Sequence, residues 1–345
     1  MLAAVLTAPG TIELQDLPVP QPDADSVLVR VRACALCGSD VRILHHGNPR
    51  VRPPQVMGHE IAGEVVAVGE RVSKFAVGER VAIGADVPCG ECEACEAGMG
   101  NNCATNLAMG YQFAGGFAEY VLLEPRVVRF GPVHRIPGGL SDDVATLAEP
   151  LACAINGYEV AGLRPGETVV VIGAGPIGCM LVEYGRFLGA GKVILVQRSR
   201  TRLELARPFG AQVAFSSLDQ DPVARVQAET GGRGADVIFT ANSSPEAQEQ
   251  ALQMLGFRAR LNLFGGLPPG SRPISFDSNL VHYREAVVTG SHGSVPRHHA
   301  LALRLLAAGA INGERYITHR YPLTEVHEAF KTAASGEALK VILHP

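Results

Sequence analysis

The chain has no tryptophan, and aromatic residues make up only 6% of its 345 residues, so it offers no aromatic platform for stacking nucleic-acid bases. Its formal net charge of −4 gives no general electrostatic attraction to nucleic acid. No apolar run approaches the roughly 20 residues that span a bilayer. Residues 1–6 are apolar but lack the basic residues of a signal peptide. We interpret them as a strand and expect a cytoplasmic protein that binds neither nucleic acid nor membrane.

The length favours two domains, and four of the eight cysteines crowd together. Cys89, Cys92, Cys95 and Cys103 follow the spacing C-x2-C-x2-C-x7-C. Four thiolates so spaced can close tetrahedrally around one zinc ion and leave no open position. A [4Fe–4S] cluster is the competing interpretation, but the end of its bacterial motif, C-x3-C-P, is missing from this run. In a cytoplasmic chain such crowding indicates a metal rather than disulfides, and the spacing predicts a structural zinc site.

A second motif begins at a short apolar, β-branched run, residues 168–172, which is typical of a buried parallel strand. The next residues fit G-x-G-x-x-G with Gly173, Gly175 and Gly178, and Pro176 and Ile177 open a helix that we expect to end near residue 188. The three glycines allow the turn, the approach of a pyrophosphate and close helix packing. A glycine-rich turn without a ligand, or a methyltransferase-type nucleotide fold, remains the alternative.

Strand-like and helix-like runs then alternate as far as residue 264, which predicts a doubly wound parallel sheet. In NAD-binding sheets an acidic residue at the end of the second strand holds the ribose 2′-hydroxyl. Gln197 stands there, and the nearby residues that we expect to contact the cofactor are Arg198, Ser199, Arg200 and Arg202. Since guanidinium groups pair well with a 2′-phosphate, the sequence favours NADP over NAD.

Two motifs in the first 60 residues supply metal-binding side chains. Cys37 follows a strand-like run, and His59 and Glu60 stand together farther on. A thiolate, an imidazole and a carboxylate are typical ligands of an open catalytic zinc site, which has three protein ligands and one exchangeable position. Each residue alone would be unremarkable, because buried structural cysteines and histidines are common. Together they suggest a second, catalytic zinc site.

The motifs, taken in order, resemble those of the zinc-containing medium-chain dehydrogenase/reductase family. They are Cys37-Gly-Ser-Asp, Gly58-His-Glu, the four-cysteine run, Ala148-Glu-Pro-Leu and the glycine-rich turn. Within the family the chain resembles the polyol (sorbitol) and threonine dehydrogenase branch. The resemblance implies an α/β fold with a discontinuous, GroES-like, β-rich catalytic domain (1–150, with 295–345 returning to it) and a Rossmann cofactor domain (151–294). It also implies that zinc and nicotinamide share the cleft between the domains.

The resemblance further assigns roles to particular residues. Cys37 and His59 match the catalytic zinc ligands, and Glu60 matches a carboxylate that is a direct ligand in the polyol branch. Glu149 stands where alcohol dehydrogenases have cysteine. Only one of the two glutamates needs to bind the metal directly at a time; the other can bind through water or exchange with it. The resemblance therefore leaves open which glutamate is the inner ligand.

Ser39 matches the hydroxyl that passes a proton from the substrate toward solvent. The family often has histidine where this chain has Arg42, and arginine cannot relay protons in a neutral form. His45 or His46 could substitute, although solvated loop histidines are the simpler interpretation. For the nicotinamide end of the cofactor, the resemblance implies contacts from Phe264, Gly265, Ser291 and His292.

We therefore expect two zinc ions per chain and reversible, nicotinamide-dependent oxidation of a secondary alcohol, polyol or sugar-like, to a ketone. One alternative function is a dehydrogenase of L-threonine or another amino alcohol. Another is an NADPH-dependent ketone or aldehyde reductase of secondary metabolism. A nucleotide-binding structural relative without activity is the non-enzymatic alternative, and a zinc-free quinone reductase is disfavoured. These motifs do not specify the small-molecule substrate, the physiological direction of the reaction or the choice between homodimer and homotetramer.

Overall fold

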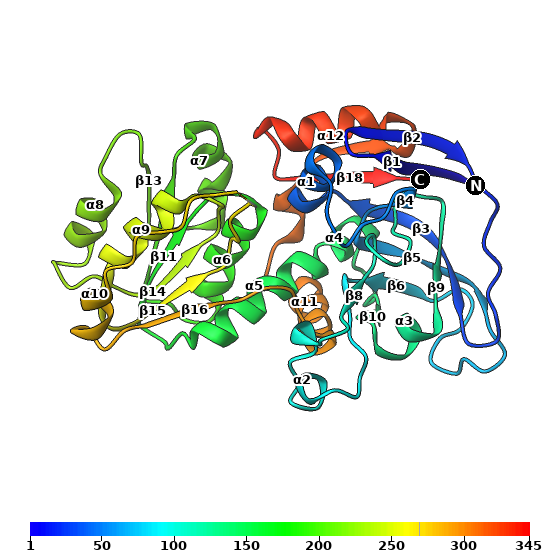
Figure 1. Cartoon of the computed structure of the whole chain (residues 1–345), viewed down its shortest axis with the longest axis horizontal. Helices are drawn as coiled ribbons and strands as arrows, with labels where there is room; N and C mark the ends of the chain where they lie inside the picture. The colour runs from blue at the N-terminus through cyan, green and yellow to red at the C-terminus, as the bar shows by residue number, and fades with distance from the viewer. Residues whose placement is uncertain (269) are drawn as a thin grey trace. The chain divides into compact units, whose positions relative to one another are not determined.

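The structure is a computed structural model that describes residues 1–268 and 270–345. The chain forms two compact units, one made of Met1–Ala152 and Gly293–Pro345, the other of Cys153–His292. Figure 1 colours the chain by residue number, and in the first unit the C-terminal helix and strand lie beside the N-terminal strands. Within the described ranges, every helix is too short or too polar to cross a membrane.

The first unit is built on a seven-stranded sheet with the order β10-β6-β5-β3-β18-β17, to which β9 adds by pairing with β3. A three-stranded sheet, β2-β1-β4, and a two-stranded one, β7-β8, complete its β structure. The strands are β1 (Leu2–Ala8), β2 (Thr11–Asp16), β3 (Val27–Ala35), β4 (Gln55–Val56), β5 (Glu60–Val68), β6 (Arg80–Ile83), β7 (Asp86–Val87), β8 (Leu107–Ala108), β9 (Tyr120–Leu123), β10 (Val133–Arg135), β17 (Ile317–Pro322) and β18 (Lys340–His344).

Short helices connect and cover these strands. They are α1 (Gly38–His46), α2 (Glu93–Glu96), η1 (Gly100–Asn102), α3 (Pro125–Phe130), α4 (Asp142–Thr146), α11 (Pro296–Ala307), η3 (Gly313–Tyr316), η4 (Leu323–Glu325) and α12 (Val326–Ser335). Helix α5 (Ala148–Ala161) begins in the first unit and ends in the second. Alternating apolar residues of β3 and β5 pack with Phe117 and Phe330 in one large buried core. Burial of this apolar area is the main stabilising term for the unit.

The last strand brings the end of the chain into the centre of the first unit. β18 pairs antiparallel with β3, with Ile342 opposite Ala35, and β3 pairs antiparallel with β5, with Ala35 opposite Glu60. Because β3 lies between the other two strands, the first residues of β18 and β5 come close to the residues that follow β3. This topology brings three distant parts of the sequence together at one sheet end.

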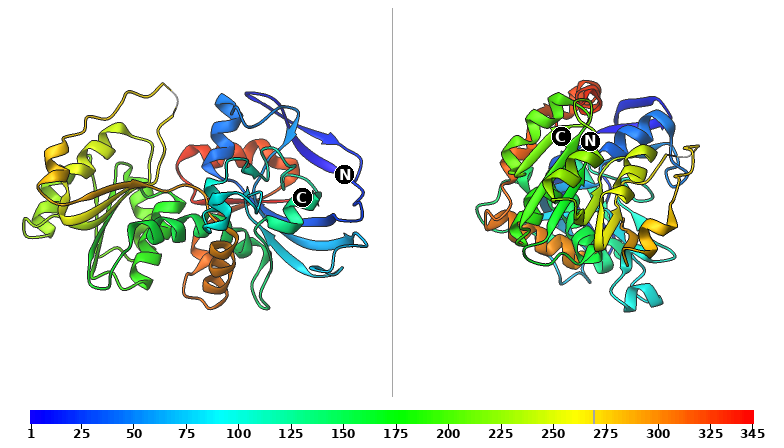
Figure 2. Two further views of the ribbon diagram at one scale, coloured as in Figure 1. Left: turned by 60° about the horizontal axis from the view of Figure 1, so that its bottom comes forward. Right: turned by 90° about the vertical axis from the view of Figure 1, so that its left-hand side faces the viewer.

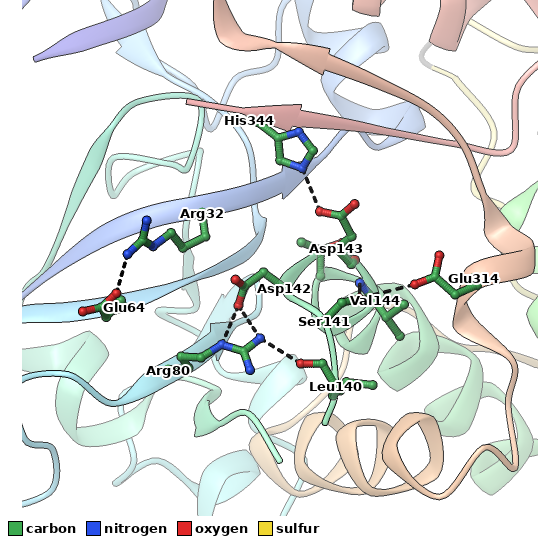
Figure 3. Close-up of polar contacts among 11 residues, drawn as sticks. Arg32, Glu64, Arg80, Leu140, Ser141, Asp142, Asp143, Val144, Glu314 and His344 are labelled. Atoms are coloured by element: carbon green, nitrogen blue, oxygen red, sulfur yellow. Dashed lines mark hydrogen bonds and ion pairs between the residues drawn. The ribbon is translucent and has the colours of Figure 1, made fainter. Parts of the chain in front are cut away.

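Polar contacts fasten the other end of β18 (Figure 3). Nε2 of His344 lies 2.7 Å from Oδ1 of Asp143, in α4. Arg80 of β6 donates to Oδ1 of Asp142 at 2.9 Å and to the carbonyl of Leu140 at 2.8 Å. The hydroxyl of Ser141 accepts the Val144 N–H and so caps α4. These contacts fix α4, and through it the start of α5.

The second unit is a six-stranded parallel sheet with the order β13-β12-β11-β14-β15-β16, which confirms the predicted doubly wound fold. Figure 2 shows helices on both faces of this sheet. Its elements are β11 (Thr168–Ile172), α6 (Pro176–Phe187), β12 (Lys192–Gln197), α7 (Arg200–Ala206), η2 (Arg207–Phe209), β13 (Val213–Ser216), α8 (Pro222–Glu229), β14 (Ala235–Thr240), α9 (Pro245–Gln253), β15 (Leu255–Leu263), α10 (Ser278–His282) and β16 (Val287–Gly290).

Two prolines influence helix boundaries that the sequence predicts differently. The sequence predicts a helix over residues 151–161, but α5 begins at Ala148, because Pro150 is tolerated in the first turn of a helix. The sequence also predicts a helix over residues 201–209, which is instead α7 followed by the 3₁₀ turn η2, where Pro208 has no N–H to continue the α-helical ladder. The first difference matters for the site, because it places Glu149 in the first turn of α5.

Candidate functional site

Cys37 stands between the central strand β3 and helix α1, at the N-cap of the helix. The Asp40 side chain reaches back and accepts the Cys37 N–H at 2.9 Å, which closes the first turn. The N-cap position places the Cys37 sulfur at the positive end of the helix dipole. The Cys-Gly-Ser-Asp sequence thus both starts the helix and presents a half-buried thiol.

His59 and Glu60 are presented by a glycine turn at the start of β5. Gly58 has φ +90°, and a Cβ there would lie 2.7 Å from the Phe117 ring and 2.8 Å from Sγ of Cys34. Only glycine fits both this conformation and this close packing. The turn places His59 and Glu60 in the interior of the first unit, where they are 4% and 0% exposed.

Cys37, His59 and Glu60 each place one ligand atom within 4.8 Å of the other two. The Nδ1 atom of His59 lies 3.3 Å from Oδ1 of Asp40, an arrangement typical of a metal-bound histidine whose other nitrogen faces the ion. Although burial opposes a charge on the ring, Asp40 and Cys37 raise the pKa of His59 well above its usual value. The site therefore favours positive charge, and its sulfur, nitrogen and oxygen donors fit zinc.

Lys340, which the sequence analysis missed, lies in the same site. Its Nζ contacts both carboxylate oxygens of Glu60 and lies 3.4 Å from the carbonyl of Leu36. The lysine is 2% exposed. Although burial opposes its charge, the negative groups Glu60, Cys37 and Glu149 raise the pKa of Lys340. A lysine directly before the apolar run of residues 341–343 was the available signal.

Glu149, in the first turn of α5, interacts electrostatically with His59, Glu60 and Lys340. It is 7% exposed, and burial, reinforced by Glu60, raises its pKa to about 7 against the opposing effects of His59 and Lys340. Its carboxylate is outside the set of atoms within 4.8 Å. The structure therefore gathers three of the four predicted catalytic-zinc residues, Cys37, His59 and Glu60, in one tight set, and Glu149 lies outside it.

Ser39 lies beside this centre, with its Oγ 3.3 Å from Nε2 of His59. Arg42 is exposed, and His45 is six residues farther along α1 than Ser39, about 9 Å along the helix axis, so it cannot bond Ser39 directly. His46 is one residue farther still. Tyr111, also missed in the sequence, packs its ring against His59 with centroids 5.8 Å apart. The structure thus brings Ser39 to the site and leaves the two histidines away from it.

The four cysteines of the predicted structural site also meet, with all four Sγ atoms within 4.8 Å of one another. Although burial opposes it, hydrogen bonds from the Cys89 and Thr105 backbone lower the pKa of Cys103 to about 6. Burial raises the pKa of Cys95 to about 11. A closed set of four sulfurs fits one tetrahedral zinc ion with no open position.

Contacts from α3 hold both ends of this cysteine lobe (residues 88–105). Arg126 donates to the carbonyl of Pro88 at 3.1 Å and to the carbonyl of Thr105 at 2.6 Å. Gly90, with φ +84°, turns the chain directly against the Phe130 ring, where a Cβ would clash. The lobe itself has few buried side chains, so a metal is the feature best able to order its interior.

In the second unit, the glycine-rich turn follows β11 as predicted. Gly173 has φ +121°, and a Cβ there would lie 2.6 Å from the Ala241 carbonyl; a Cβ on Gly178 would clash with the Gly173 carbonyl. At Gly175, by contrast, a Cβ would meet only Nη1 of Arg202, at 3.4 Å. The first and third glycines are thus required by the fold, whereas the second leaves room for a ligand. Pro176 and Ile177 form the first turn of α6.

A pocket of about 510 Å³ opens beside this turn within the second unit. Gln197 accepts the Ala174 N–H at 3.2 Å, and Arg198 belongs to the pocket wall. Arg200 is absent from the described lining and forms an ion pair with Asp219. The lining residues are Ile172, Gly173, Val196, Gln197, Arg198, Ser217, Asn242, Ser244, Glu246, Ala247 and Gln250.

The remaining predicted cofactor residues lie around the carboxyl ends of the strands. Ser199 caps α7 by accepting the Arg202 N–H at 3.3 Å. The Gly265 N–H donates to the Thr240 carbonyl at 2.7 Å, and the Ser291 hydroxyl donates to Oδ1 of Asn262 at 2.9 Å. Phe264 and His292 follow the ends of β15 and β16. Ligands of open α/β sheets bind at these strand ends.

Comparison with known proteins agrees with both units. The family model for the alcohol dehydrogenase GroES-like domain matches residues 23–132, and that for zinc-binding dehydrogenase matches residues 176–308. L-Threonine 3-dehydrogenase of Bacillus licheniformis is 33% identical, and the alignment covers 100% of this chain and 99% of that protein. Sorbitol dehydrogenase of Halalkalibacterium halodurans is 32% identical, with the same coverage.

Among solved structures, a zinc-binding dehydrogenase from Sinorhizobium meliloti bound to NADP superposes with a TM-score of 0.91. It is 32% identical, and the match covers 100% of this chain and 99% of that one. These findings confirm the resemblance that the motifs indicated.

Proposed function

The chain belongs to the zinc-binding dehydrogenases that carry an alcohol dehydrogenase GroES-like domain, and from this premise we propose that it reversibly oxidises a secondary alcohol of a polyol or sugar-like substrate to a ketone. The observation that carries the proposal is the convergence of Cys37, His59 and Glu60 within 4.8 Å in a buried site. A purely structural role would not require an open metal site among buried anionic groups. This argues against a nucleotide-binding scaffold without activity and against a zinc-free reductase.

Cys37 and His59, with one of Glu60 and Glu149, would hold the catalytic zinc, which acts as a Lewis acid that acidifies a bound hydroxyl. The thiolate is presented by the helix N-terminus, and Asp40 orients the imidazole. Cys89, Cys92, Cys95 and Cys103 would hold a second zinc with a structural role. We therefore propose two zinc ions per chain.

Ser39 is the residue best placed to accept the proton of the substrate hydroxyl. Its Oγ lies beside the metal-facing nitrogen of His59, and a hydroxyl can accept one proton while passing on another. A bound nicotinamide would supply the hydride acceptor, whose chemistry belongs to the cofactor. The role of the protein is to hold the alcohol, remove the proton and position the cofactor.

We propose NADP as the preferred cofactor. The end of β12 carries Gln197 rather than a carboxylate, and the neighbouring Arg198 lines the adjacent pocket. Glu246 lines it too, and Arg272 contacts it at 3.0 Å while also pairing with Glu249. The Arg198 guanidinium suits a 2′-phosphate, and the Sinorhizobium meliloti relative is bound to NADP.

L-Threonine is the second candidate substrate, because the relatives with this named activity include proteins 33–35% identical over nearly the whole chain. Sorbitol and threonine both carry the reacting hydroxyl next to a second polar group. In sorbitol the polar group next to the reacting hydroxyl is a second hydroxyl, whereas in L-threonine it is an amine.

The second unit also offers a surface for self-association, and we propose a homodimer or homotetramer. β16 is an edge strand of the sheet, and it carries Val287, which is 53% exposed. Phe257 on the paired strand β15 is 77% exposed, and Tyr283, which precedes β16 in sequence, is 73% exposed. An edge strand with exposed apolar neighbours is a typical place for pairing with a second copy.

A matrix of substrates and cofactors tests the proposed function. Purified protein would be assayed with sorbitol, other polyols, sugar alcohol phosphates and L-threonine, each with NAD and with NADP. We expect the highest kcat/KM for a polyol with NADP. Turnover of L-threonine alone would replace the substrate assignment, and the absence of any alcohol oxidation by a zinc-loaded protein would contradict the enzymatic assignment.

A further inference from the structure

Tyr111 connects the proposed metal site to a positively charged side chain, Arg50. The Tyr111 ring packs against the His59 ring, with centroids 5.8 Å apart, and Cζ of Arg50 lies 5.4 Å from the centroid of the same tyrosine ring. Burial raises the pKa of Tyr111 against the opposing effects of His59 and Ser39, so the tyrosine is close to both of these residues. The guanidinium therefore shares an aromatic neighbour with a proposed zinc ligand.

A short turn after α1 holds Arg50 in this place. The Asn48 side chain accepts the Arg50 N–H at 2.8 Å, and the next residue, Val51, is 6% exposed and belongs to the core of the first unit. At the far end of the side chain, Nη2 of Arg50 donates to the Asn106 carbonyl at 3.2 Å. Stacking on Tyr111 restricts the guanidinium further. Both ends of the arginine are therefore held, although the residue is exposed.

The charge of Arg50 is not balanced by an acidic neighbour. Arg80 pairs with a carboxylate, but within the described part of the chain no carboxylate forms an ion pair with Arg50, whose side-chain hydrogen bond goes to the Asn106 carbonyl. The carboxylate that contacts Asn106, that of Asp86, instead accepts the Asn106 amide at 2.7 Å and the Ser294 N–H at 3.0 Å. Because a guanidinium has five N–H donors, most of those of Arg50 remain available to a ligand.

We propose that Arg50 is a specificity-determining residue that binds an anionic group of the substrate, a phosphate or a carboxylate, while the reacting hydroxyl lies beside His59. A guanidinium binds such groups through two parallel charge-assisted hydrogen bonds, whereas a neutral polyol gains no comparable contact from it. The inference rests on the proposed function, because it presupposes that the alcohol binds at the proposed metal site. It narrows the substrate class from polyols in general to alcohols that carry a negative charge.

Two matched substrate pairs test this assignment and separate its two forms. Zinc-loaded, full-length protein would be assayed with sorbitol and sorbitol 6-phosphate, and with L-threonine and L-threoninamide, each with NAD and with NADP. We expect kcat/KM for at least one anionic member to exceed that of its partner without the anion by about tenfold or more. A preference for sorbitol 6-phosphate assigns a phosphate to Arg50, and a preference for L-threonine assigns a carboxylate.

The outcomes of this assay distinguish the inference from the proposed function. Equal kcat/KM values within both pairs would overturn the role of Arg50 and leave the proposed alcohol oxidation intact. If no alcohol is oxidised by the zinc-loaded protein, the proposed function falls together with this inference.

Variants of Arg50 test which residue causes the preference. Arg50→Ala should lower the ratio of kcat/KM for the anionic to the neutral substrate by about 10–100-fold, because the charge-assisted contact is lost. Arg50→Lys keeps the charge but not the planar fork, and it should lose part of the preference. An unchanged ratio in Arg50→Ala would overturn the inference.

Arg30→Ala is the matched control for these variants. Arg30 is also exposed and stacked on a tyrosine, with its Cζ 5.8 Å from the ring centroid of Tyr120, but it lies in β3, roughly 20 Å along the strand from Cys37. Its removal changes the net charge by the same amount, and we expect the ratio of the anionic to the neutral substrate to stay at the wild-type value.

Chemical labelling gives a readout that does not depend on turnover. Phenylglyoxal modifies accessible guanidinium groups, peptide mass spectrometry locates the product, and inorganic phosphate is the probe. We expect phosphate to slow the labelling of Arg50 while the labelling of Arg30 keeps its rate. Labelling of Arg50 that phosphate does not slow, in protein that still oxidises an alcohol, would overturn the inference independently of the proposed function.

Discussion

Oδ1 of Asp40 lies 3.3 Å from Nδ1 of His59, and both side chains are buried. The second oxygen of the same carboxylate accepts the Cys37 N–H. One aspartate therefore orients two of the proposed zinc ligands, which links the start of α1 to the chemistry of the site. A partner of this kind fixes the tautomer of a ligating histidine and increases its basicity.

Asp40→Asn is expected to weaken zinc binding at the Cys37 site by roughly 10–100-fold. The amide oxygen can still accept the Cys37 N–H, so the helix start is kept while the negative charge beside His59 is lost. Competition with a chromophoric chelator would measure the affinity. The four-cysteine site is the internal control, and its affinity should not change; equal weakening of both sites would indicate general unfolding instead of a lost partner of His59.

Arg198→Ala is expected to raise the KM for NADP by about 10–100-fold, because a charge-assisted contact to the 2′-phosphate is lost. The KM for NAD should change little. Arg200→Ala is the matched control, since Arg200 is exposed and paired with Asp219 rather than lining the pocket. Steady-state kinetics with both cofactors would measure the effects. Equal losses for NAD and NADP in Arg198→Ala would contradict the NADP assignment.

The His134–His299 pair predicts how stability depends on pH. The two Nδ1 atoms lie 3.0 Å apart. Burial, aided by Lys74 and Arg304, lowers the pKa of His134 to about 4, and burial next to His134 lowers that of His299 to about 3. In the unfolded chain histidine titrates near 6.5. Between these values the unfolded state binds more protons, so the stability contribution present above pH 6.5 is lost as the pH falls.

Urea unfolding at pH 7 and at pH 5 would measure this loss in wild type and in His299→Leu. The variant removes one depressed histidine, and we expect a smaller decrease in its free energy of unfolding between the two pH values. A wild-type midpoint that rises on acidification, or an identical decrease in the variant, would contradict the assignment of the pH dependence to this pair.

Removal of the metal from the cysteine lobe is expected to unfold the lobe locally, because it has little apolar core of its own. Cys95→Ser should release one zinc and make residues 88–105 exchange their amide hydrogens quickly, while β3 and β5 stay protected. Hydrogen exchange measured by mass spectrometry would locate the change. Unaltered protection of the lobe in a Cys95→Ser protein that lacks the second zinc would show that Arg126 and Phe130 hold it without the metal.

Local signals made much of the fold predictable. The strand at Thr168–Ile172, the glycine turn and helix α6 depend on neighbouring residues, and the structure contains them where the sequence indicated. The cysteine spacing and the Gly58-His59-Glu60 turn are also local. The packing that fixes the Gly58 turn is not local, because it involves Phe117, which is distant in sequence.

Long-range pairing explains what the sequence did not reveal. Lys340 meets Glu60 only because β18 joins β3, 280 residues from its partner. Arg200 pairs with Asp219, which follows β13, whereas Arg198 lines the pocket. Neither contact has a periodic or motif signature, so both had to come from the tertiary structure.

The most direct test of the central claim is alcohol-dependent cofactor reduction by Cys37→Ser, measured together with its zinc content. The account predicts a folded protein that retains one zinc of two, still binds the nicotinamide cofactor and oxidises its best alcohol at least about 1,000-fold more slowly, because Lewis-acid activation worth several kcal/mol is lost. Wild-type turnover by a Cys37→Ser protein that lacks the catalytic zinc would contradict it.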